Sequence, residues 1–101
     1  MKVLVLATWE NPKSDEGLKK YYEYNQKHNE YGNERREKYN VKDSSWSDGT
    51  GKMYWLQEFE NYETYAKFMD DEEYQKIMIH GWRNVKNGKI KVLRESISAP
   101  P

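Results

Sequence analysis

The chain has 101 residues, of which 17 are Lys or Arg, 17 are Asp or Glu and none is cysteine. That length predicts one domain with a thin hydrophobic core. The balanced charge lacks the basic footprint that binding to nucleic acid or an anionic membrane requires, and the absence of cysteine excludes disulfides, thiolate zinc sites and cysteine nucleophiles. Aromatic residues make up 15% of the chain although its mean hydropathy is −1.25, so tyrosine and tryptophan rings are expected to supply much of the apolar area.

The N-terminal part of the chain is predicted to form a strand followed by a long helix. Residues 3–9 are a continuous apolar run, which suits a buried strand and is too short for a signal peptide or a membrane span. A cytoplasmic protein is therefore expected. Ser14 or Asp15 can cap a helical segment that extends to about Tyr39, and the sequence leaves open whether the helix continues past Gly32 or ends or kinks there.

Five further elements and a tail are expected after this helix. They are a weak strand at 41–47, a turn at 47–51, a strong strand at 52–59, a helix from about 62 to 86, a last strand at 89–97 and a tail at 99–101. Asn61 is a good N-cap for the second helix. Asp70 is expected to restart that helix, since Glu73 follows it at capping-box spacing, and Asn87-Gly88 to stop it.

The predicted order of elements is β-α-β-β-α-β within a single domain at residues 1–98. A four-stranded antiparallel sheet with two helices on one face satisfies this order, because both crossovers are helical and the middle connection is a hairpin. The fold class is therefore a ferredoxin-like α+β fold. The two most apolar strands, at 3–9 and 52–59, are expected in the middle of the sheet, with the more polar strands at its edges.

Both faces of the predicted sheet are apolar near its middle. On the third strand, one face carries Met53, Trp55, Gln57 and Phe59, and the other carries Tyr54, Leu56 and Glu58. Phe59 is expected to face the helices because it directly precedes one. Two helices can cover only one face, and a soluble monomer rarely exposes a large apolar patch. A homodimer through the second sheet face is therefore predicted.

The segment at 56–77, LQEFENYETYAKFMDDEEYQKI, is similar to the strand-then-helix segment of the dimeric α/β-barrel superfamily, which has ferredoxin-like topology. The resemblance extends over nearly the whole chain in element order. It implies a homodimer whose sheets form a barrel, with a cleft between sheet and helices in each subunit. Members include cofactor-free monooxygenases, heme-degrading enzymes, and isomerases or lyases that act on small organic molecules.

The resemblance does not extend to heme ligation, and no cofactor is expected. In the heme-degrading members an axial histidine lies about one turn after an aromatic residue that matches Tyr74, a position occupied here by Met78. His80 is six residues after Tyr74 and therefore on another helical face. Phe68 stands where those enzymes have a tryptophan. Two histidines without i, i+4 spacing also predict no metal site.

Glu58 and His28 are the candidate catalytic residues. Glu58 is predicted to face away from the helices, where it could act as a base; alternatively it is an ordinary strand-end carboxylate paired with a Lys or Arg such as Arg94. His28 shares a helical side with several tyrosines, including Tyr31. They could form a proton-transfer cluster, or His28 could be a partly exposed residue satisfied by water or backbone.

Five aromatic residues are candidates for ligand binding, although each could instead pack in the core or the dimer. They are Trp9, Tyr21, Tyr24, Tyr54 and Trp55. The sequence thus predicts a protein that binds a small organic ligand, as a cofactor-independent monooxygenase or isomerase. The alternative is a non-enzymatic homodimeric binding or assembly module with a filled aromatic core. Neither class involves nucleic acid or a membrane.

Overall fold

A computed structural model describes residues 1–96 and contains four strands and three helices over that part of the chain. The elements are β1 (Val3–Glu10), α1 (Asp15–Lys38), β2 (Lys42–Ser47), β3 (Lys52–Phe59), α2 (Tyr62–Met69), α3 (Glu72–Trp82) and β4 (Lys86–Arg94). The predicted end of the last strand at 97 and the tail at 99–101 lie outside the described residues. No helix of the described chain is long and apolar enough to cross a membrane.

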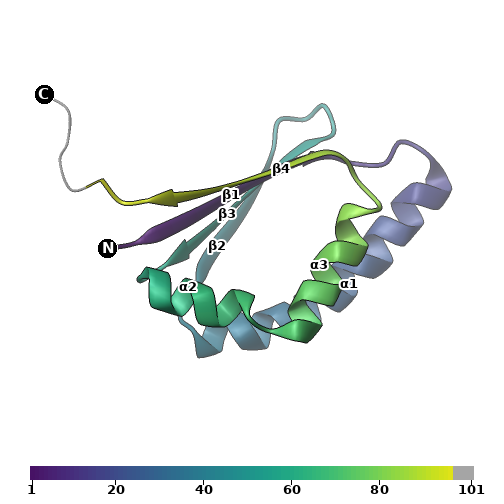
Figure 1. The fold of residues 1–101 in the computed structure, drawn as a ribbon. Helices are drawn as coiled ribbons and strands as arrows, with labels where there is room; N and C mark the ends of the chain where they lie inside the picture. Colours follow the sequence, from purple (N-terminus) through teal and green to yellow (C-terminus); the bar gives the residue numbers. More distant parts are fainter. Residues whose placement is uncertain (97–101) are drawn as a thin grey trace, which may run out of the picture.

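The strands form one antiparallel sheet in the order β2-β3-β1-β4, so β1 and β3 are central as predicted. All three helices lie on one side of this sheet, with α1 and α3 side by side (Figure 1). This arrangement confirms the ferredoxin-like α+β fold. The predicted second helix forms as two helices, α2 and α3, divided at the acidic segment where a restart was expected.

One end of the helix layer is closed by a dense aromatic core. Val3 of β1 pairs with Phe59 of β3, and both side chains point toward the helices with at most 1% of their surface exposed. Phe68 of α2 packs edge-on against Phe59, with ring centroids 5.3 Å apart, and against Tyr74 of α3 at 4.8 Å. We call this cluster, completed by Val41, the closed end.

Helix α1 continues through Gly32, a point that the sequence left open. A Cβ on Gly32 would stand 2.7 Å from Nη1 of Arg36, one turn later on the same helix. The glycine thus leaves room for a guanidinium group that lies along the helix, and the backbone keeps its helical hydrogen bonds.

The break between α2 and α3 is fixed by Asp71, not by Asp70 as predicted. The Asp71 carboxylate accepts a hydrogen bond from the backbone N–H of Tyr74 at 2.6 Å, as the N-cap of α3. The same carboxylate accepts a hydrogen bond from the Tyr31 hydroxyl at 2.9 Å and pairs with Arg35 at 2.8 Å. Asp71 therefore ties the start of α3 to two residues of α1.

Strand β4 starts three residues earlier than predicted, and α3 ends at Trp82, earlier than the predicted residue 86. The pairing register between β1 and β4 shifts between Thr8 and Glu10, which leaves Trp9 opposite a bulge. Asn87 has a φ of 53° in this bulge, and its side-chain amide donates to the Glu10 carboxylate at 2.5 Å. The Asn-Gly pair that was expected to stop a helix instead bends a strand.

Candidate functional site

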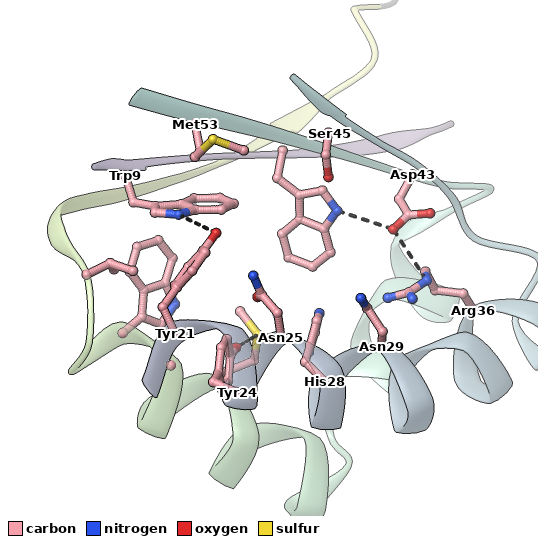
Figure 2. A pocket seen from close by; sticks show the side chains of 15 residues that line it. Trp9, Tyr21, Tyr24, Asn25, His28, Asn29, Arg36, Asp43, Ser45 and Met53 are labelled. Atoms are coloured by element: carbon pink, nitrogen blue, oxygen red, sulfur yellow. Dashed lines mark hydrogen bonds and ion pairs between the residues drawn. The ribbon is translucent and has the colours of Figure 1, made fainter. Parts of the chain in front are cut away.

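A cavity of about 280 Å³ lies at the other end of the helix layer, between the sheet and helices α1 and α3 (Figure 2). We call it the helix-side cavity. It is lined by Trp9, Tyr21, Tyr24, Asn25, His28, Asn29, Arg36, Asp43, Ser45, Met53, Trp55, Met78, Gly81, Trp82 and Val85. Its volume is just below the range of about 300–1,000 Å³ that is usual for small-molecule sites, which suits a small ligand.

Aromatic rings line one end of this cavity. The indole N–H of Trp9, near the end of β1, donates to the Tyr21 hydroxyl at 3.2 Å, and Figure 2 shows the two side chains meeting across the cavity edge. The Trp82 ring stands edge-on to Trp9, with centroids 6.1 Å apart. These three rings offer a ligand flat apolar surface, with both polar atoms of the Trp9–Tyr21 pair already satisfied.

The opposite end is polar and carries an ion pair between a buried arginine and a partly exposed aspartate. Arg36 is 8% exposed, and its Nε lies 3.3 Å from an Asp43 carboxylate oxygen. The same oxygen accepts a hydrogen bond from the Trp55 indole at 3.2 Å (Figure 2). Arg36 also donates to the Asn33 side chain at 2.5 Å. The pair is close to neutral overall, so this end can both donate hydrogen bonds to a ligand and accept them from it.

His28 lies between the two ends and is 8% exposed. Its imidazole stacks on the Tyr24 ring, with ring centroids 5.7 Å apart. The rings of Trp55 and Tyr74 lie beside it, each with its centroid 5.6 Å from that of the imidazole. Burial, reinforced by the charge of Arg36 and opposed by that of Asp43, lowers the pKa of His28 from 6.5 to about 4. The imidazole is therefore neutral at pH 7.

The Nδ1 atom of His28 is buried and has no hydrogen-bond partner within residues 1–96. Buried polar atoms are nearly always paired in folded proteins, and those that are not often mark a functional group. The His28 side chain rises from α1 toward the sheet and into the cavity (Figure 2). The His28 side chain thus lines the cavity, while its Nδ1 atom is closed off from solvent.

Tyr24 supports His28 from one turn earlier on α1. Burial, with a smaller contribution from Tyr21, raises the pKa of Tyr24 to about 12, so its hydroxyl stays protonated at neutral pH. The hydroxyl lies 3.5 Å from the Met78 sulfur on α3. A Cβ on Gly81 would overlap the Tyr24 ring, so this glycine inside α3 allows the ring to approach the helix backbone.

The structure brings five of the predicted site residues together around the cavity and leaves two elsewhere. His28, Trp9, Tyr21, Tyr24 and Trp55 line the cavity. The other two, Glu58 and Tyr54, belong to the opposite sheet face, because they alternate with the inward-facing Trp55 and Gln57.

The expectation that Glu58 and His28 share a cleft is therefore corrected. Glu58 pairs instead with Lys2 at 3.4 Å, and its side chain is 37% exposed. The alternative, that Glu58 is a strand-end carboxylate paired with a Lys or Arg, therefore fits, with Lys2 as the partner. Arg94, the example given for that partner, instead places its guanidinium over the Tyr62 ring, 4.7 Å from the ring centroid. The strand alternation had placed Glu58 away from the helices, and a residue on that face cannot enter a cavity beneath them.

The sequence analysis missed the polar residues of the site. Asn25 and Asn29 reach the cavity from α1, Arg36 follows two turns later, and Asp43 and Ser45 come from β2. Helical spacing could have identified the two asparagines, since residues 21, 25, 28 and 29 share one helical side. Nothing local marked Arg36, which lies in a charged run typical of a solvated helix face.

The described residues contain no group of three or more His, Asp or Glu side chains that could hold a metal ion. His80, the second histidine of the chain, is exposed on α3 and does not line the helix-side cavity. The described residues that could act on a ligand in this cavity are thus side chains of α1 and β2, with His28 at the centre.

No protein-family model matches the sequence, and no curated protein matches it. Solved structures do match. A variant of SnoaB, a cofactor-independent oxygenase from Streptomyces nogalater, is similar over 99% of this chain and 98% of its own, with a TM-score of 0.69 and 5% identity. A candidate antibiotic biosynthesis monooxygenase from Deinococcus radiodurans has a TM-score of 0.70, 13% identity and coverage of 98% and 97%. A conserved protein from Methanosarcina mazei has a TM-score of 0.72, 10% identity and coverage of 95% and 94%.

The chain shares the ferredoxin-like α+β fold of these solved structures. The matches extend over nearly the full length of both chains, so the resemblance found in residues 56–77 is confirmed at the level of the whole fold. At such low sequence identity this likeness establishes the fold and leaves the chemistry to the site itself.

Proposed function

We propose that this protein binds a small aromatic molecule in the helix-side cavity and oxidises it with molecular oxygen, without a cofactor. The observation that carries the proposal is His28, a neutral imidazole with a buried, unpartnered Nδ1 inside an aromatic-walled cavity. Two of the structural neighbours are described as an oxygenase and a monooxygenase, and the first as cofactor-independent.

In this proposal His28 removes the proton from a ligand hydroxyl, and the resulting electron-rich anion reacts with oxygen directly. With 1-naphthol, a C–O bond forms at the ring carbon opposite the hydroxyl, and that carbon loses its hydrogen. The O–O bond then breaks, one oxygen stays as a carbonyl and the other leaves as water. The ligand supplies all four electrons that reduce the O₂ molecule, so the products are 1,4-naphthoquinone and water. An isomerase would use the same base without consuming oxygen.

The polar end of the cavity orients the ligand in this scheme. The hydroxyl lies next to His28, while Arg36 and Asp43 offer a donor and an acceptor to any second polar group. Tyr24 stays protonated, so it stacks against the imidazole without competing as a base. The alternative of a filled aromatic core is less well supported, because these rings surround a cavity of about 280 Å³.

The proposal includes a homodimer formed through the sheet face that the helices leave uncovered. Leu6 pairs with Leu56 at the centre of that face, and Trp46 pairs with Tyr54 beside it. Trp46 is 60% exposed. We expect Leu56→Glu to convert a dimer into a monomer in light scattering, because it would bury a charge in the interface. A wild-type chain that is monomeric at micromolar concentration would contradict the dimer.

The test of the function is 1-naphthol binding and oxygen uptake. We expect calorimetry to detect binding to the wild type, and an oxygen electrode to record one O₂ consumed per naphthoquinone formed. His28→Gln should lower the rate by about 10²-fold or more while changing the affinity only a few-fold. His80→Gln is the matched control and should leave the rate unchanged. Equal rates in wild type and His28→Gln would reject the proposed base, and binding without turnover would favour a binding module.

A further inference from the structure

The end of the helix-side cavity between α3 and β4 is formed by Trp82, and we propose that this residue sets how many fused rings a ligand can have. The inference rests on the proposed ligand-binding function, and it concerns the size class of the ligand. It is carried by three features of this end of the cavity: a bulge in β4, a glycine beneath the indole, and the position of the indole between cavity and solvent.

The bulge in β4 lies next to the aromatic end of the cavity. The register shift leaves Trp9 of β1 without a directly paired residue on β4, while Thr8 pairs with Lys89 and Glu10 with Lys86. Asn87 takes a positive φ there, and its hydrogen bond to Glu10 ties the bulge to β1. Bulges re-aim neighbouring side chains and often lie beside functional sites.

Gly88 follows in this bulge and provides the surface on which Trp82 lies. A Cβ at position 88 would overlap the six-membered ring of the indole, so no other residue can stand there while Trp82 keeps its place. The opposite contact is with Trp9, whose ring meets Trp82 edge-on at 84°. The indole is thus held between two neighbouring strands of the sheet.

Trp82 is half-buried at the C-terminal end of α3, so it lines the cavity and also keeps part of its surface exposed to solvent. A core residue would be enclosed on all sides, as Phe68 is at the closed end. Trp82 instead has one contact with the cavity, one with the strand backbone and one with water. Its removal would therefore extend the cavity outward, and would not simply leave an enclosed hole.

The volume gives the expected size limit. A cavity of about 150 Å³ in another protein accepts one benzene ring. At about 280 Å³, the helix-side cavity should accept two fused rings and exclude three. Loss of the indole would add space along the same axis, so a three-ring ligand should then fit.

The experiment compares phenol, 1-naphthol and 1-hydroxyanthracene by calorimetry. The wild type should prefer 1-naphthol to 1-hydroxyanthracene by about tenfold or more, and Trp82→Ala should reverse that preference, while Trp82→Phe should give an intermediate result. Ile79→Ala removes an exposed apolar side chain of α3 that does not line the cavity and is the matched control, with the wild-type preference expected.

A second variant keeps the test independent of how well Trp82→Ala folds. Gly88→Ala should displace the indole and so change the preference between the two- and three-ring ligands. In a protein that already carries Trp82→Ala, the same substitution should leave that preference unchanged, because no indole remains to be displaced. An unchanged preference in both Trp82→Ala and Gly88→Ala, with 1-naphthol still bound, would overturn the size limit alone. Failure of the wild type to bind any of the three ligands would overturn the proposed function together with it.

Discussion

The two ends of the helix layer rest on the same sheet face, yet one is filled and the other is hollow. At the closed end, Phe59 and Phe68 are fully buried and meet edge to face. At the cavity end, the inward rings of Trp9 and Tyr21 meet at the cavity edge and leave open space between sheet and helices. Both ends are rich in aromatic residues, so composition does not distinguish them.

Glycines distinguish the two ends. Three cavity-lining side chains, those of Arg36, Tyr24 and Trp82, each lie against a glycine within a regular element, at Gly32, Gly81 and Gly88. Glycine inside a helix costs about 1 kcal/mol relative to alanine, so each such position needs a compensating reason. Here the shared reason is that a large side chain is held back against the backbone, which keeps the cavity open.

The largest expected effect is at the closed end. Phe68→Ala should destabilise the protein by about 3–5 kcal/mol, because it removes a fully buried ring and leaves a cavity. Tyr21→Phe at the cavity end loses only the hydrogen bond from Trp9, so it should lower the free energy of unfolding by about 1 kcal/mol. Urea unfolding monitored by tryptophan fluorescence measures both. Equal costs would show that the two ends do not differ in packing.

A smaller and pH-dependent effect is expected at His28. Its pKa is lowered from 6.5 to about 4 in the folded protein, so between these values the unfolded chain binds more protons than the folded one. The stability that the folded protein gains from keeping His28 neutral is fully present above about pH 6.5 and is lost as the pH falls toward 4.

At pH 4.5 the loss should amount to about 2–3 kcal/mol relative to pH 7. His28→Gln cannot bind the proton, so urea unfolding at the two pH values should show a smaller loss in this variant than in the wild type. His80→Gln is the control for the other histidine. If His28→Gln lost as much stability as the wild type, the imidazole would be solvated and not buried in the cavity wall.

Much of the fold follows from the alternation of residues along the strands and from the caps. Alternation along β3 placed Phe59 toward the helices and Glu58 away from them, as the structure has them. The N-cap at Asn61 is also correct, since its side chain accepts from the backbone N–H of Thr64 at 2.8 Å. These features depend on near neighbours in the chain, which is why the sequence reveals them.

The site is harder to predict because its key contacts join residues distant in sequence. Arg36 looks like a solvated charge until β2 brings Asp43 next to it. Gly88 looks like a helix stop until the indole of Trp82 is seen lying on it. Glu58 was paired with His28 as two candidate catalytic groups, although helix and strand geometry place them on opposite faces of the sheet. Local patterns identified the aromatic walls, and only the tertiary fold shows which of them share a cavity.

The most direct test of the account is a pH titration of the protein with isotopically labelled histidine, observed by NMR with and without 1-naphthol. The chain contains only two histidines, so His28 and the exposed His80 can be told apart with one variant. We expect the His28 imidazole to titrate near pH 4 and its Nδ1 signal to shift when 1-naphthol binds, while His80 does not respond to the ligand. A His28 that titrates near 6.5 and ignores the ligand would contradict the central claim.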